Sequence, residues 1–155
     1  MQAYPVLIMI GAQGAFAQKP VFLAFGKEGI VVVKYDKNEI KAVTERLVQE
    51  SKDRGEGKLK QMAASMQAVG TYCDMLAQKS MADILAQSNE NFLIAGESLN
   101  RIKLDEKTDM ENNQDSYVLT VKSSNGKYKF NLRPYNGQIR ELKKTGKTLY
   151  PGVFK

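Results

Sequence analysis

The stretch YVLTVKSSNGKYKFNLR, residues 117–133, constrains the fold more than any other part of the sequence. Apolar side chains alternate with lysines in it, as expected for strands that bury one face. Asn125-Gly126 predicts a two-residue hairpin turn, because both residues tolerate the positive φ of a type I′ turn. Such a turn fixes how the two strands pair. The predicted pairs are Ser124 with Lys127, Lys122 with Lys129, Val121 with Phe130, and Leu119 with Leu132.

One face of this predicted hairpin is basic. Four bases share it: Lys122, Lys127, Lys129 and Arg133. Such a cluster attracts the phosphates of a lipid surface or a nucleic acid, and facing lysines destabilise a hairpin mildly without a counterion. Tyr128 and Phe130 point to the core, so the basic face has no aromatic platform for stacking single-stranded bases. The alternative is a solvated polar face that keeps a sheet edge from pairing.

Positive charge is concentrated at the C-terminal end of the chain. The 155 residues carry 23 Lys/Arg and 17 Asp/Glu, a net charge of +6. Residues 116–155 hold nine of these bases and one acid, Glu141, whereas the preceding 115 residues hold fourteen bases and sixteen acids. This asymmetry favours an anionic partner, through long-range attraction rather than a specific code.

The first third of the chain is predicted to form strands. Val6–Ile10 is a continuous apolar run, and a Gly/Ala/Gln loop follows it as far as Pro20. Val21–Phe25 and Ile30–Tyr35 flank the turn GKEG and predict a second hairpin. Ile30–Val33 is apolar on both faces, so we expect cover on both sides of this strand, from the segment that follows.

The middle of the chain changes to a helical period. Asp36 and Glu39 have the spacing of a capping box at the start of a first helix. After the break DRGEG, residues 53–57, a helix of about five turns is predicted from a 3-4-3-4-3 apolar spacing. Its seam consists of Leu59, Met62, Met66, Val69, Cys73 and Leu76. Two helices joined by a short loop predict an antiparallel helical hairpin, and Ser80 with Asp83 caps a short third helix.

The last third returns to strands. Strands are predicted in NFLIA and in SLNRIKLDE, and residues 106–116 are predicted to be an exposed acidic loop before the 117–133 hairpin. A short helix is expected near Gln138–Lys144. We expect the basic residues beyond it to be loose, unless four apolar side chains dock them. These side chains are Leu149, Tyr150, Val153 and Phe154.

Together these elements predict one α+β domain, in which a helical hairpin is inserted into a twisted antiparallel sheet and packs against it. The predicted parts are strands at 6–35, a helical insert at 38–88, strands at 92–133 and a basic C-terminal segment at 134–155. One cysteine excludes an internal disulfide and fits a reducing compartment. We expect no signal peptide and no transmembrane segment, and therefore a cytoplasmic protein.

The residue types exclude several kinds of catalysis. The chain has no histidine, so Ser–His–Asp and Cys–His mechanisms and His-ligated metals are excluded. Cys73 occupies an apolar helical position, which indicates a buried side chain. The carboxylates between Asp105 and Asp115 do not have the spacing of an EF-hand calcium loop. We therefore predict no metal, no cofactor and no enzymatic activity.

Part of the sequence resembles prokaryotic pleckstrin-homology-like (PH-like) domains. The resemblance lies in ILAQSNENFLIAGESLNRIKLDE and YVLTVKSSNGKYKFNL, within about residues 84–132, and FLAFGKEGIVVVKY is similar to the opening hairpin of that family. It implies a strongly bent antiparallel sheet, a PH-like partial barrel, packed with helices. It assigns no activity, because such domains serve lipid, peptide or self-association roles. The long C-terminal helix that usually closes such a barrel is not obvious in this sequence.

Three functional interpretations follow. The first is a non-enzymatic interaction module whose basic final hairpin and C-terminal segment bind an anionic surface, a nucleic acid or a protein partner. The second is a self-associating structural or accessory subunit, a homo-oligomer, that uses Met62 and Met66 on the helical seam. Met at this spacing also suits an ordinary core. The third is a small-molecule enzyme, which a pocket lined by paired carboxylates would favour.

Overall fold

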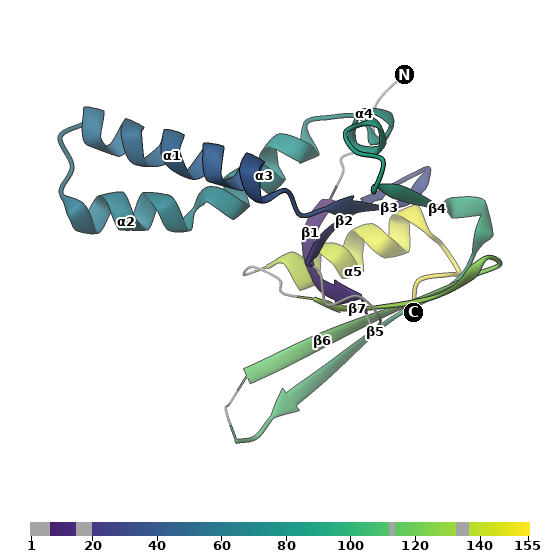
Figure 1. Ribbon diagram of the computed structural model, residues 1–155. Coiled ribbons are helices and arrows are strands. Elements are labelled where there is room, and N and C mark those ends of the chain that lie inside the picture. Colours follow the sequence, from purple (N-terminus) through teal and green to yellow (C-terminus); the bar gives the residue numbers. More distant parts are fainter. Residues whose placement is uncertain (1–6, 15–19, 112–113, 133–136) are drawn as a thin grey trace. The chain divides into compact units, whose positions relative to one another are not determined.

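The computed structural model describes residues 7–14, 20–111, 114–132 and 137–155. The chain divides into two compact units, one made of residues 1–35 and 79–155 and the other of Asp36–Gln78. The first unit contains an antiparallel sheet with helices, and the second is helical (Figure 1). The predicted α+β class, with an antiparallel sheet and inserted helices, is therefore confirmed.

Seven strands of the described residues form one sheet in the order β4-β3-β2-β1-β7-β6-β5. The strands are β1 (Leu7–Gly14), β2 (Val21–Gly26), β3 (Gly29–Lys34), β4 (Phe92–Ala95), β5 (Leu99–Asp109), β6 (Gln114–Ser123) and β7 (Gly126–Leu132). The helices of this unit are α4 (Met81–Ala86), the short 3₁₀ turn η1 (Gly96–Ser98) and α5 (Gln138–Leu149). Because β4 and β5 are the two unpaired edges of this strand order, the sheet of the described residues does not form a closed barrel.

Helix α5 packs on the apolar inner side of the sheet. Leu142 on α5 is fully buried with Leu23, Ile30 and Leu119 in one hydrophobic cluster, which also contains Phe154. The helix is longer than the predicted Gln138–Lys144, and the chain after it is docked rather than loose. The buried ring of Phe154 and a parallel bridge from Phe154 to Ile102 on β5 explain this correction. The many bases in this part of the sequence made the apolar stripe that packs α5 on the sheet hard to recognise.

Tyr150 fastens the end of α5 to the turn between β2 and β3. Its hydroxyl lies 2.7 Å from the carbonyl oxygen of Gly26 and 2.9 Å from that of Gly29, and its single O–H donates a hydrogen bond that these two oxygens share. Burial raises the pKa of this phenol, partly offset by the hydrogen bond to Gly26. Tyr150 therefore holds two segments far apart in sequence as a neutral hydrogen-bond donor.

Strands β2 and β3 form the predicted hairpin, and both faces of β3 are buried as expected, while cover by the segment directly after β3 stays a prediction. All four residues of Ile30–Val33 are buried. Helix α4, which Ser80 caps as predicted, packs against β3. Asn91 connects these elements, because its side chain accepts from the backbone N–H of Lys34 at 2.7 Å and donates to the carbonyl of Ile84 at 2.9 Å.

The predicted acidic loop at 106–116 is wrong over most of its length. Strands β5 and β6 continue to Asp109 and from Gln114, beyond the point where β6 pairs with β7 (Figure 1). Side-chain hydrogen bonds support this two-stranded arm, such as Thr108 Oγ1 to Asp115 Oδ1 at 3.0 Å. Cross-strand pairing therefore overrides a polar composition that is usually found in loops.

The predicted register of the final hairpin is wrong by two residues. β6 pairs with β7 so that Lys122 lies opposite Lys127, not Lys129, and Val121 lies opposite Tyr128. The turn residues are Ser124-Asn125, one position before the predicted pair, and Gly126 pairs with Ser123. The Ser123 hydroxyl favours this turn, because it accepts from the Asn125 N–H at 3.2 Å and donates to the Gly126 carbonyl at 3.1 Å. A shift of two leaves every side chain on its predicted face.

Strand β1 is also longer than predicted. It runs to Gly14 through residues that were expected to form a loop, because Gly11 and Gly14 pair with Leu132 and Phe130 of β7. This pairing joins the N-terminal strands to the C-terminal ones. The composition around these glycines favours a loop, but pairing with β7 makes the segment a strand.

The second unit contains α1 (Lys37–Asp53), α2 (Lys58–Met66) and α3 (Ala68–Ala77). Asp36 caps α1 as predicted, accepting from the N–H groups of Asn38 and Glu39 at 3.0 and 3.3 Å. At the α1–α2 loop, Glu56 accepts from the buried Ser51 hydroxyl at 2.9 Å and pairs with Arg54. These hydrogen bonds lower the pKa of the Glu56 carboxyl.

The predicted five-turn helix of this unit is two helices. The break falls at Gln67, between α2 and α3. The two halves of the apolar seam have different surroundings, because Cys73 and Leu76 are buried whereas Met62 and Met66 are exposed. The unit ends at Gln78, so α4, which the sequence placed in the helical insert, belongs to the sheet unit.

Candidate anion-binding site

The outer face of β5, β6 and β7 carries a compact array of basic side chains. Arg101 on β5 lies opposite Lys122 on β6, which lies opposite Lys127 on β7. Two residues along the strands, Lys103 lies opposite Thr120, and Thr120 lies opposite Lys129. We call these six residues the cation grid: Arg101, Lys103, Thr120, Lys122, Lys127 and Lys129.

The alternation of the strands holds the five bases of the cation grid on the solvent side. Between them, Ile102, Leu119 and Val121 are fully buried on the other face, and all five basic residues are exposed. Successive side chains of a strand point to opposite faces. The apolar core therefore fixes the direction of the bases, and no separate contact is needed to hold them there.

The cation grid surrounds a shallow hollow of about 220 Å³. Thr120 occupies its floor and is only 9% exposed, while the bases stand around it. One acid, Asp105, borders the hollow, and its carboxylate lies 3.5 Å from the Lys103 ammonium. Five cations beside one anion make this surface strongly positive. Like charges on neighbouring strands cost stability unless a counterion binds.

Sequence analysis found part of this site. It placed Lys122, Lys127 and Lys129 on one face, and the structure brings these three together. Arg133, the fourth predicted member, lies outside the described residues. The sequence analysis missed Arg101 and Lys103. The signal that could have revealed them is their alternation with the apolar residues Ile102 and Leu104.

A bulge on β5 concealed the two missed bases. Leu99 pairs with Ser123 and Arg101 with Lys122, so one extra residue, Asn100, interrupts the register. Leu99 and Ile102 are consequently both buried, although they are three positions apart and strict alternation would place them on opposite faces. The alternation in this strand therefore looked imperfect from the sequence alone.

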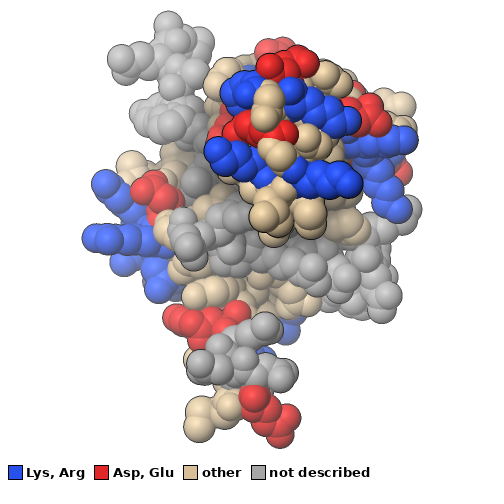
Figure 2. Space-filling view, turned by 90° about the vertical axis from the view of Figure 1, so that its left-hand side faces the viewer, with Lys and Arg blue, Asp and Glu red and all other residues tan. Residues whose placement is uncertain are grey.

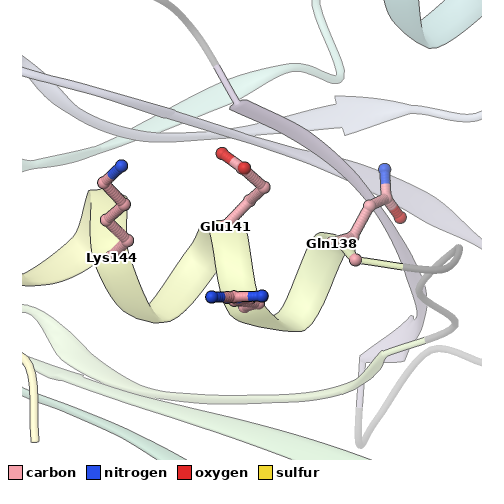
Figure 3. A pocket seen from close by; sticks show the side chains of 5 residues that line it. Gln138, Glu141 and Lys144 are labelled. Carbon is pink, nitrogen blue, oxygen red and sulfur yellow. The ribbon is translucent and has the colours of Figure 1, made fainter.

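A second hollow, of about 530 Å³, lies at the start of α5. Gln138, Glu141 and Lys144 project from the same side of this helix (Figure 3). Arg140 also lines the hollow, so bases and an acid are mixed there. This mixture favours neither an anion nor a cation, and the hollow is a weaker candidate for binding a charged ligand than the cation grid.

The two methionines of the predicted self-association site lie on α2. Met62 and Met66 are 62% and 80% exposed, so the interpretation of these residues as core is wrong. Leu59, three residues before Met62, is 83% exposed. We call these three residues the α2 stripe, because their spacing places them on one face of the helix.

Other reactive groups give little support to catalysis. Cys73 is buried as predicted, and burial together with the nearby Asp74 raises the pKa of its thiol to about 12, so it is protonated near neutral pH. Among the residues that the structure describes, no three acidic or cysteine side chains gather as metal ligands would. No helix in the same residues has the length and apolar character needed to cross a bilayer.

Comparison of the chain with protein-family models, with curated proteins and with solved structures finds no match.

Proposed function

We propose that this chain is a non-enzymatic interaction module, related to PH-like domains, that binds an anionic partner through the cation grid. The observation that carries this proposal is the convergence of five bases from three adjacent strands around one hollow. The PH-like relationship rests on the sequence resemblance, which implies an antiparallel sheet packed with helices. The sheet holds the backbone of these bases in place, so the entropy lost when a ligand binds is mainly that of the side chains.

The overall charge also supports an anionic partner. Residues 36–78 carry seven bases and seven acids, so the net charge of +6 belongs to the sheet unit. This charge draws anions to the unit over distances of about one Debye length, roughly 8 Å at physiological ionic strength. The cation grid then supplies the short-range contacts.

Reversal of two charges tests the proposal. In the variant Lys122→Glu/Lys129→Glu, three bases face two new carboxylates and Asp105, so the cation grid loses its net positive charge. We expect binding to phosphatidylglycerol-containing vesicles or to an oligonucleotide, measured at low salt, to weaken at least tenfold. Circular dichroism should show an unchanged fold, because both side chains are exposed.

The matched control is Lys143→Glu/Lys147→Glu on the exposed side of α5, which changes the net charge equally. This control should keep most of the binding. An equal loss in both variants would show that net charge alone governs binding, and unchanged binding in the cation-grid variant would contradict the proposal.

The α2 stripe favours a second function, self-association with another copy of this chain. Three large apolar side chains on one helix face are unusual on a monomer surface. The helical unit has no net charge, and its bases and acids are interspersed at the end that faces the viewer in Figure 2. Two copies therefore meet there without the repulsion that the basic sheet unit would impose.

Light scattering over a range of concentrations tests this second function. We expect a weak dimer that is insensitive to salt and that dissociates in the variant Met62→Asp/Met66→Asp, while each monomer remains folded. Ala42→Asp/Gln67→Asp introduces the same charges at other exposed positions and should leave the dimer intact. A wild-type protein that is monomeric at every concentration would contradict self-association.

A further inference from the structure

The cation grid has a definite charge and size, and these two properties indicate what kind of anion it binds. We propose that its ligand is a compact anion with two neighbouring phosphate groups, rather than a long polyanion such as a nucleic acid. This inference rests on the proposed function, because it concerns the same surface. Three features of the structure carry it: the balance of charge, the size of the hollow, and the acidic arm next to it.

The charge balance favours two phosphate groups. The cation grid has five bases, and with Asp105 at its border the hollow carries a net charge of +4. A phosphate monoester carries about −1.5 to −2 near pH 7. One such group would leave the cation grid half neutralised, whereas two would match its charge.

The dimensions of the cation grid agree with this number. Neighbouring strands are about 5 Å apart, and residues two apart along a strand are separated by about 7 Å. The Cα atoms of the bases therefore lie on a rectangle of about 10 by 7 Å. The hollow of about 220 Å³ is smaller than the usual 300–1,000 Å³ of drug-sized ligand sites. A small phosphorylated group fits this space.

The floor of the hollow offers a further contact. Thr120 lies between Lys103 and Lys129 in the cross-strand row and is almost buried. Its hydroxyl can donate to a phosphate oxygen that enters the hollow, and a hydrogen bond to a charged acceptor is among the stronger kinds. A diffuse positive surface would not need this residue, whereas a site that holds a compact anion would use it.

The arm formed by β5 and β6 opposes a longer ligand. Asp105 follows Lys103 on the same face of β5, and residues 105–115 contain five acids and one base, Lys107. Acidic groups stand along this arm, at the bottom of Figure 2. On the face of the cation grid, Asp105 is followed by Lys107, whereas Glu106 belongs to the opposite face. The arm as a whole nevertheless carries a net charge of −4, so it would repel a polyanion laid along it, and each added phosphate would contribute little to binding.

Calorimetric titration of the full chain at constant ionic strength tests the inference, with inorganic phosphate, pyrophosphate, and oligothymidylates of increasing length as probes. We expect pyrophosphate to bind at least tenfold more tightly than phosphate. Oligothymidylate affinity should stop rising after the first few nucleotides. Thr120→Val, which keeps the shape of a strand residue, should weaken pyrophosphate binding severalfold and leave the fold unchanged.

Phosphatidylcholine vesicles doped with phosphatidic acid distinguish two sources of the phosphate groups. Vesicle binding that pyrophosphate displaces indicates a lipid headgroup, and pyrophosphate binding without vesicle binding indicates a soluble compound. Both results support a compact anion. Affinity that rises steadily with oligothymidylate length and exceeds that of pyrophosphate would overturn the inference and leave the proposed function standing. If Lys122→Glu/Lys129→Glu binds every probe as well as wild type does, both fail.

Discussion

Replacement of Gly29 by alanine is expected to lower the free energy of unfolding by more than about 3 kcal/mol. Gly29 begins β3 with φ of +137°, a conformation that residues with a side chain rarely adopt. A Cβ atom there would lie 2.2 Å from the carbonyl oxygen of Ile94 and 2.7 Å from the Gly96 nitrogen. These are backbone atoms of β4 and η1, so only separation of the strands relieves the clash.

Gly152→Ala is the matched control. Gly152 has φ of +79°, but nothing lies within 4 Å of the Cβ position, so this variant carries the cost of backbone strain without the clash. We expect a loss of about 1–2 kcal/mol from it. Urea unfolding followed by circular dichroism measures both variants. Equal losses of unfolding free energy in the two variants would contradict the predicted clash of a Cβ atom at position 29 with β4 and η1.

Tyr150→Phe is expected to lower the free energy of unfolding by about 1–3 kcal/mol near neutral pH. The substitution keeps the buried ring and removes the hydroxyl that donates to the carbonyl oxygens of Gly26 and Gly29. These carbonyls then lose a donor in a part of the core that water does not reach.

The pH dependence of this difference gives a second test. Because the folded pKa of Tyr150 is raised, the unfolded chain loses the phenolic proton first, at about pH 10. Between that pH and the folded pKa, the unfolded state binds fewer protons than the folded state, so the stability of wild type falls as pH rises. The difference in the free energy of unfolding between wild type and Tyr150→Phe should therefore become smaller above about pH 10. A gap that is constant up to alkaline pH would contradict the burial of this hydroxyl.

Local signals in the sequence predicted the elements whose causes are local. Asp36 and Ser80 cap helices where a short polar side chain precedes an apolar stripe, and the structure has both caps. The turn at Lys27-Glu28 and the strands beside it follow from composition in the same way. In these segments the hydrogen bonds and side-chain contacts that decide the structure lie within a few residues of one another.

Elements that depend on distant partners could not be predicted as well. Strand β1 extends through Gly11 and Gly14 because β7 pairs with them, and α5 extends to Leu149 because the core accepts Leu149 and Tyr150. No pattern near these residues in the sequence shows those partners. The single-domain organisation stays a prediction, since the helical residues form a compact unit of their own.

The candidate site combines both kinds of information. Alternation in one hairpin predicted that Lys122, Lys127 and Lys129 share a face, and this holds although the predicted register was shifted by two. Arg101 and Lys103 join them only because β5 pairs with β6 past a bulge. The sequence therefore predicts a basic strand pair, and the pairing of a third strand, β5, completes the basic surface around the hollow.

The most direct test of this account is an NMR titration of the chain with pyrophosphate, followed through the backbone amides. If the cation grid binds the anion, the amide signals of Arg101, Thr120 and Lys127 should shift together and saturate with one common affinity. The signals of α5 around Lys143, on the other basic surface, should stay in place. Shifts concentrated on α5, or no saturable shifts on β5, β6 and β7, would contradict the assignment of the binding site to the cation grid.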